Sequence, residues 1–133
     1  MKTERLIIFT DGVSRGNPGP AAIGATIKNE QGKAISSVSQ PIGQTTNNQA
    51  EYRAIIAALE EAIKLGAKHV EMRSDSELVV RQINGQYRVK KETLKPLYQQ
   101  VKQLQNQFEN FTITHIPREQ NTEADSLANI ALR

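Results

Sequence analysis

The stretch RLIIFTDGVSRGNPGP, residues 5–20, decides how the rest of the chain is interpreted. Its run Leu6–Phe9 has no polar interruption, which is typical of a strand buried on both faces at the centre of a sheet. Asp11 stands at the predicted end of this strand, and a segment dense in glycine and proline follows. Asp11 is therefore either an ordinary turn aspartate or a carboxylate held at the edge of a rigid core, where an active site can be built.

The composition is that of a globular protein: 133 residues, 38% hydrophobic and 23% charged. No apolar run approaches the roughly 18 residues of a membrane span, and the N-terminal residues show no signal-peptide cleavage site. The absence of cysteine excludes disulfides and thiolate metal sites. We therefore expect one domain over residues 1–133, located in the cytoplasm and not in a membrane. The net charge of +3 and pI near 9.3 permit a polyanionic partner without requiring one.

The pattern of apolar and turn residues predicts the element order βββαβααβα, an α/β fold. The predicted strands cover residues 6–11, 21–28, 33–40, 68–75 and 111–116. Possible cap residues at 45–48 precede a helix that runs to about residue 65, further helices cover 76–83 and 93–108, and Asn121 or Thr122 caps a last one. A right-handed crossover through the first helix would make the first and fourth strands parallel neighbours.

Four carboxylates stand at the ends of these elements. Asp11 and Asp75 would lie side by side at the carboxyl ends of adjacent strands, where α/β sheets place their ligands. Glu51 falls on the buried stripe of the first helix, and Asp125 shares the apolar face of the last one. Ordinary structural roles are also open, since Asp75 could cap the following helix and Glu51 could complement the helix dipole.

A divalent cation explains the four carboxylates together better than separate structural roles do. Unpaired carboxylates a few ångströms apart raise one another's pKa, and a cation between them removes that repulsion. An all-oxygen ligand set favours Mg²⁺ or Mn²⁺ over zinc. Two such ions can activate a water and stabilise the leaving oxygen of a phosphodiester.

Four separated blocks carry a family resemblance: TDGVSRGNPGPAAIG, TTNNQAEYRAIIAALE, RSDSELVVRQING and PREQNTEADSLAN. In this order, and over nearly the whole chain, they resemble type 1 ribonuclease H. The likeness is to the short bacterial and archaeal members that lack an N-terminal hybrid-binding domain. It implies a ribonuclease H-like five-stranded mixed sheet ordered 3-2-1-4-5. It also implies endonucleolytic cleavage of RNA paired with DNA, leaving 5′-phosphate and 3′-hydroxyl ends.

The resemblance assigns residues as well as an activity. By it, the catalytic set that holds two Mg²⁺ ions, with Mn²⁺ as a substitute, is Asp11, Glu51, Asp75 and Asp125. The substrate-contacting positions that it implies are Gly12, Asn17, Thr46, Asn47, Gln49, Ser74 and Glu77. Amide side chains can donate to and accept from 2′-hydroxyls without reading bases, which suits a nuclease that is independent of sequence. Helix capping is the ordinary alternative for Asn47 and Asn48.

Two residues near the last helix are candidates for a further catalytic role. His115 lies ten residues before Asp125, as the family's catalytic-loop histidine does, but within the predicted fifth strand, where a histidine is more often structural. Arg118 is the other candidate for helping the scissile phosphate or the product to leave.

The chain departs from the family pattern at two further places. Val13 stands where the family usually has serine or alanine, which alters the expected packing near the metals. The connection 85–92 is too short for the basic protrusion of longer relatives, and Arg88, Lys90 and Lys91 are its partial replacement.

These departures keep alternatives to the nuclease open. One is a non-catalytic or weakly active nucleic-acid-binding module with the same fold. Another is a DNA-cutting nuclease of the wider group, such as a resolvase or an integrase. In each case a monomer is expected, with a nucleic acid as partner and, for the leading hypothesis, an RNA/DNA hybrid.

Overall fold

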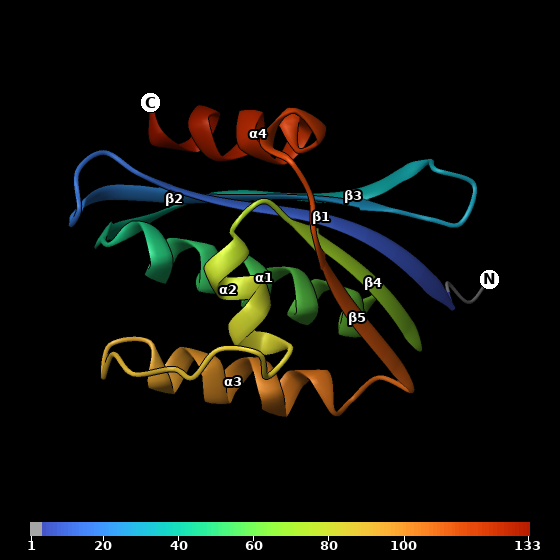
Figure 1. The fold of residues 1–133 in the computed structure, drawn as a ribbon. Helices are drawn as coiled ribbons and strands as arrows, with labels where there is room; N and C mark the ends of the chain where they lie inside the picture. The colour runs from blue at the N-terminus through green and yellow to red at the C-terminus, as the bar shows by residue number, and fades with distance from the viewer. Residues whose placement is uncertain (1–3) are drawn as a thin grey trace.

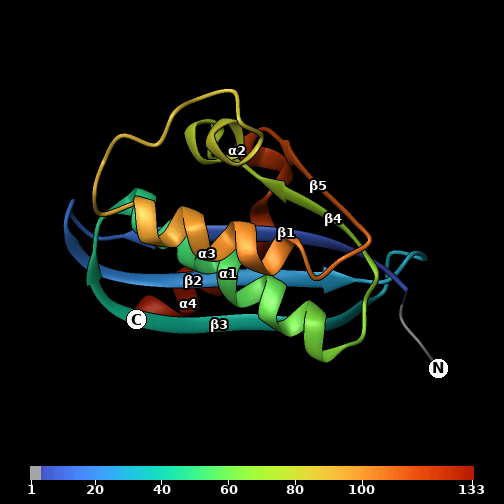
Figure 2. The same ribbon diagram turned by 90° about the horizontal axis from the view of Figure 1, so that it is seen from below.

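The computed structural model describes residues 4–133, which form one five-stranded sheet with helices on both faces (Figures 1 and 2). The elements in chain order are β1 (Arg5–Ser14), β2 (Gly19–Lys28), β3 (Ala34–Thr45), α1 (Asn47–Lys64), β4 (His69–Ser74), α2 (Glu77–Ile83), α3 (Lys95–Gln105), β5 (Asn110–His115), the 3₁₀ turn η1 (Arg118–Gln120) and α4 (Thr122–Leu132). The predicted order βββαβααβα is confirmed.

The sheet has the predicted strand order β3-β2-β1-β4-β5. Strands β1, β2 and β3 form an antiparallel meander, and β4 and β5 are parallel to β1 and to each other. The last registered pair between β1 and β4 is Thr10 with Ser74. Strands β1 and β4, which α1 connects in the chain, are therefore parallel neighbours, as the sequence predicts.

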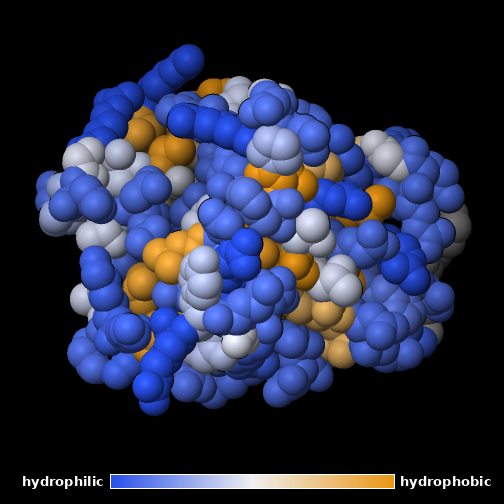
Figure 3. Space-filling model, viewed as in Figure 1, coloured by the Kyte–Doolittle hydropathy of each residue, from blue (hydrophilic) through white to orange (hydrophobic). Residues whose placement is uncertain are grey.

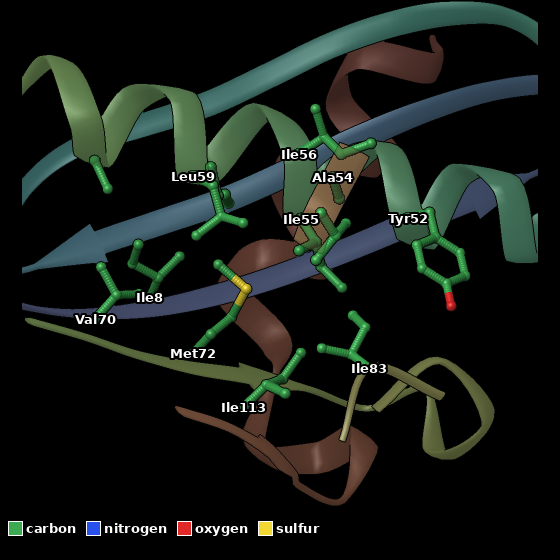
Figure 4. Packing of buried hydrophobic residues seen from close by; sticks show 14 of the residues in the cluster. Ile8, Tyr52, Ala54, Ile55, Ile56, Leu59, Val70, Met72, Ile83 and Ile113 are labelled. Atoms are coloured by element: carbon green, nitrogen blue, oxygen red, sulfur yellow. The ribbon is translucent and has the colours of Figure 1, made fainter. Parts of the chain in front are cut away.

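The helices cover the two faces unequally. Helix α1 lies against β1 and β2, with α3 packed on its outer side, whereas α4 lies on the opposite face over β2, β1 and β3 (Figure 1). Most of the hydrophobic core lies between the sheet and α1. There Ile55 and Leu59 pack over Ile8 and Met72 (Figure 4).

The prediction that the first strand is buried on both faces is only partly right. Leu6 and Ile8 are fully buried, but Ile7 and Phe9, which point to the other face, are half-buried. At that point the ring of Phe9 lies beneath the side-chain cations of Lys28 and Arg73, 5.3 and 5.5 Å from its centroid. Long basic side chains, rather than a helix, shield this part of the sheet.

Several predicted boundaries were wrong. Strand β1 does not end at Asp11 but continues to Ser14, because its antiparallel pairing with β2 outlasts its pairing with β4. Strand β3 likewise continues to Thr45. Helix α3 begins later and ends earlier than predicted, at Lys95 and Gln105. Pro96, which lacks an N–H, sits at its start.

The N-cap of α1 lies within the predicted cluster 45–48, but the alternatives in which Asn47 or Asn48 caps α1 and Asp75 caps α2 were wrong. The N-cap of α1 is Thr46, not Asn47 or Asn48, because Thr46 and Gln49 stand three residues apart and form a reciprocal capping box. The cap of α2 is Ser76, whose hydroxyl accepts a hydrogen bond from the N–H of Val79. Capping therefore does not explain Asp75.

The surface is predominantly hydrophilic on the face shown in Figure 3, with small separated apolar patches. In the described part of the chain, only three large hydrophobic residues are exposed: Leu78, Tyr87 and Ile130. No helix within residues 4–133 is both long enough and apolar enough to cross a membrane.

Candidate active site

Asp11, Glu51 and Asp75 come together at one edge of the molecule. Asp11 follows Thr10 in β1, and Asp75 follows Ser74 at the end of β4, so the last paired residues of the two strands place these carboxylates side by side. Glu51 reaches the same point from the first turns of α1. One carboxylate oxygen from each of the three residues lies within 4.8 Å of the other two.

The position of Glu51 depends on a close approach between α1 and β1. A Cβ atom added at Gly12 would lie 2.3 Å from the carbonyl carbon of Ala50, so only glycine fits there. The N–H of Gly12 donates to Glu51 Oε1 at 2.7 Å. Gly12 therefore allows α1 to pack closely against β1, and its N–H orients the Glu51 side chain.

Asp125 lies in the same small cavity, which has a volume of about 270 Å³. Its other lining residues are Asp11, Gly12, Val13, Asn47, Glu51, Asp75, Ser76 and Arg118. Asp125 comes from the first turn of α4, on the opposite face of the sheet from α1. The four carboxylates that the sequence singles out are thus brought together from four different elements or element ends.

Burial and mutual repulsion perturb the innermost carboxylates. Asp11 is 5% exposed and Glu51 is 4% exposed. Burial raises the pKa of the Asp11 carboxyl well above its ordinary value of 3.8, and the charges of Glu51, Asp75 and Asp125 raise it further. Burial and then the charge of Asp75 raise the pKa of Glu51 above its ordinary 4.5, although the N–H of Gly12 acts in the opposite direction.

The donor set fits a hard divalent cation. It consists of carboxylate oxygens alone, and the cavity around them has room for water molecules. Within residues 4–133, no lysine, arginine or histidine forms an ion pair with any of the four carboxylates. A bound cation would supply the missing positive charge and let Asp11 and Glu51 ionise together.

The glycine-rich turn and the start of α1 form a second group beside the acids. Asn17 Oδ1 accepts a hydrogen bond of 2.9 Å from the backbone N–H of Asn47, which joins the turn to the helix. The Oε1 of Gln49 accepts from the Thr46 N–H at 2.9 Å and from the Thr45 hydroxyl at 2.6 Å. These contacts fix the orientation of both amides, so that their NH₂ groups remain as donors.

Of the remaining predicted site residues, one lines the acidic cavity and the others lie outside it. Arg118 lines the acidic cavity, whereas His115 is exposed at the end of β5, registered with Ser74, and is not among the lining residues. Ser74 is buried, and its hydroxyl accepts from the N–H of Ser76. Glu77 is exposed and pairs with Arg81 at 2.9 Å. These contacts place the residues without assigning them roles in a reaction.

Sequence reasoning missed one lining residue, Ser76, and foresaw two features around the site. Ser76 stands three residues before Val79 at the start of an apolar helical pattern, which is a recognisable cap signal. Val13 does line the cavity. Residues 84–94, between α2 and α3, contain no helix, as expected of a connection too short for a protrusion.

Comparison with known proteins identifies the family. Residues 9–131 match the family model described as "Reverse transcriptase-like". The chain is 43% identical over 128 residues to the ribonuclease HI of Halobacterium salinarum, covering 96% of this chain and 64% of that protein. It is 44% identical over 129 residues to the bifunctional protein Rv2228c of Mycobacterium tuberculosis, covering 96% of this chain but 35% of that protein. The chain thus spans about a third of the mycobacterial relative and about two thirds of the archaeal one.

A solved structure agrees with these sequence relatives. LC11-RNase H1 from compost, solved in complex with an RNA/DNA hybrid, superposes with a TM-score of 0.91 at 47% identity, covering 96% of each chain. This likeness includes the sheet order and extends over almost all of the described residues. The chain therefore belongs to the type 1 ribonuclease H family.

Proposed function

We propose that this protein is an endonuclease that hydrolyses the RNA strand of RNA/DNA hybrids with the help of two divalent metal ions. The observation that carries the proposal is the convergence of Asp11, Glu51 and Asp75, with oxygens within 4.8 Å of one another, beside Asp125 in one cavity. The hybrid bound to LC11-RNase H1 supports the choice of substrate. The preferred ion is Mg²⁺, with Mn²⁺ as a substitute, because all the donors are hard oxygens.

The four carboxylates would hold the ions between them, with Asp11 central to the set. When bound, the ions supply an activated water and a stabilised leaving oxygen. Cleavage that releases the 3′-oxygen leaves a 5′-phosphate and a 3′-hydroxyl. Arg118 reaches the same cavity and is suited to neutralise charge on the phosphate or on the departing product. His115, exposed one strand away, is our second candidate for assisting product release.

Recognition of the RNA strand is assigned to the group beside the acids. Asn17, Asn47 and Gln49 are assigned as amide donors to 2′-hydroxyls, and Thr46 is assigned to contact a DNA phosphate. Gly12, Ser74 and Glu77 complete the proposed contacts around the scissile bond. None of these groups reads base identity, so cleavage is expected at many sequences.

The experiment is a cleavage assay on four matched substrates: an RNA/DNA hybrid, duplex DNA, duplex RNA and single-stranded RNA. Cutting of the RNA strand confined to the hybrid supports the proposal. Equal cutting of duplex DNA would instead favour the resolvase-like reading. Hybrid binding without products, by protein shown to be folded, would favour a binding module. We also propose that residues 1–133 act as one monomeric catalytic domain in the cytoplasm, which sedimentation and cell fractionation would test.

A further inference from the structure

Asn121 is the most deeply buried amide near the acidic cavity, with 1% of its surface exposed. Its Nδ2 donates to the backbone carbonyl of Thr10 at 2.8 Å. Thr10 is the last residue of β1 registered with β4, and it immediately precedes Asp11. The side chain of Asn121 therefore supplies a donor to β1 at the point where the neighbouring strand ends.

The same residue also begins α4. Asn121 occupies the N-cap position, yet its side chain makes no capping hydrogen bond. Its carbonyl oxygen accepts the N–H of Asp125 at 3.1 Å. One residue thus contacts, through its side chain, the backbone that carries Asp11 and, through its own backbone, the turn that carries Asp125.

Stability alone does not account for an asparagine here. Its Oδ1 is buried without a hydrogen-bond partner, and the neighbouring Thr10 Oγ1 is buried and unpartnered as well. An unpaired buried polar atom destabilises a fold by about 1–3 kcal/mol. An apolar residue of similar volume would avoid that penalty at Oδ1 but would take the donor away from the Thr10 carbonyl. The amide is therefore explained by the contact that its Nδ2 makes with β1, next to Asp11.

A close backbone approach also fixes α4 on the sheet. A Cβ atom added at Gly24 would lie 2.3 Å from the carbonyl oxygen of Ala124, so the α4 backbone rests directly on β2. Gly24 is the registered partner of Asp11 across the β1–β2 pair. The absence of a side chain at Gly24 thus allows α4 to lie close to the sheet. The hydrogen bond from Asn121 to Thr10 ties the start of α4 to β1.

We propose that Asn121 is a positioning residue that fixes Asp125 against Asp11 and thereby raises the affinity of the acidic site for a divalent metal ion. The inference rests on the proposed function, because it requires divalent metal at the site. Asn121 does not line the acidic cavity. It acts by holding two ligands in register, as residues behind a metal's ligands generally do.

The test is Mn²⁺ binding by the metal-free protein, measured as free Mn²⁺ by electron paramagnetic resonance. Asn121→Leu keeps the volume and removes the amide, so the fold should survive while Mn²⁺ binding at the acidic site loses about 10–100-fold in affinity. Asn121→Ala serves as the second variant if the leucine does not fit. Asn84→Ala is the matched control, since Asn84 Nδ2 also donates to a strand carbonyl, that of Ile113 at 3.1 Å, away from the acids.

A double-mutant cycle separates positioning from general destabilisation. In an Asp125→Asn background, Asn121→Leu should weaken Mn²⁺ binding less than about twofold further, because the ligand it positions is already gone. Unchanged Mn²⁺ binding by folded Asn121→Leu, or fully additive losses in the cycle, would overturn the inference and leave the proposed function intact. A parent protein that binds no Mn²⁺ would overturn both.

Discussion

The two helices that flank the sheet each bring one carboxylate to the same cavity, but they are held very differently. Helix α1 has 18 residues, a capping box and nine buried residues packed into the main core. Helix α4 has 11 residues, no side-chain cap and only two buried residues, Ala124 and Ala128. Each rests on a glycine of the sheet, Gly12 under α1 and Gly24 under α4.

This difference divides the acidic site into two halves. Glu51 is buried, orientated by a backbone N–H and within 4.8 Å of both Asp11 and Asp75. Asp125 is only partly buried and sits on the shorter helix, which buries only two of its own residues. The α1 half of the site is therefore supported by the main hydrophobic core, whereas the α4 half rests on fewer buried side chains.

The largest expected effect comes from adding one methyl group under each helix. Gly12→Ala should lower the free energy of unfolding by about 3 kcal/mol or more, because α1 is too well packed to move away from the added Cβ. Gly24→Ala should cost about 1–3 kcal/mol, since the smaller α4 can shift. Urea unfolding of the two variants measures the difference.

The activity of Gly24→Ala should also fall if the variant folds. The displaced α4 of Gly24→Ala should carry Asp125 out of register and reduce hybrid cleavage about 100-fold while most of the stability remains. Equal losses of stability in Gly12→Ala and Gly24→Ala would contradict the proposal that α1 is held more firmly on the sheet than α4.

Removing the carboxylate that each helix supplies, Glu51 on α1 or Asp125 on α4, tests the difference between the two halves of the site. Glu51→Gln should reduce cleavage about 1,000-fold, equivalent to roughly 4 kcal/mol of lost transition-state stabilisation, and should raise the stability of the metal-free protein by removing buried charge repulsion. Asp125→Asn should reduce cleavage less and leave stability almost unchanged, because Asp125 is more exposed. Single-turnover kinetics and unfolding in EDTA provide the two readouts.

The stability of the metal-free protein, measured over a pH series, tests the buried carboxylates Asp11 and Glu51 by themselves. The raised pKa values of Asp11 and Glu51 mean that the native protein binds more protons than the unfolded chain at pH values above about 4. Stability of the metal-free protein should therefore fall as the pH rises from 5 to 9. Glu51→Gln should flatten this fall, whereas Glu60→Gln, an exposed glutamate of the same helix, should not. A parallel fall in both variants would contradict the assigned cause.

The smallest effect is expected at the edge of α4. Lys28 Nζ lies 2.8 Å from Glu123 Oε1 in a partly exposed pair that joins β2 to the first turn of α4. Glu123→Gln should lower the free energy of unfolding by less than about 1 kcal/mol. Glu92→Gln, which breaks the 2.7 Å pair with Lys95 away from the site, is the control. A large loss of cleavage in Glu123→Gln alone would show that α4 depends on this pair more than the structure indicates.

Much of the fold and the acidic cluster could be predicted from the sequence because they depend on periodic signals. The apolar stripe of α1 placed Glu51 on its inner face, and the crossover rule made Asp11 and Asp75 neighbours. Strand ends were less predictable, since β1 continues past Asp11 only because β2 still pairs with it. The role of Asn121 was hidden for a similar reason. An asparagine before a helix has the local pattern of a cap, and its contact with Thr10 joins residues 111 positions apart.

The most direct test of the account compares the parent protein with Asp11→Asn on a labelled RNA/DNA hybrid in Mg²⁺, in Mn²⁺ and in EDTA, with the fold of each confirmed by circular dichroism. Asp11 is the residue that both halves of the site share. The account predicts rapid cutting of the RNA strand by the parent in either metal, none in EDTA, and almost none by Asp11→Asn in any condition. Cutting by the parent in EDTA, or by Asp11→Asn at the parent's rate, would contradict it.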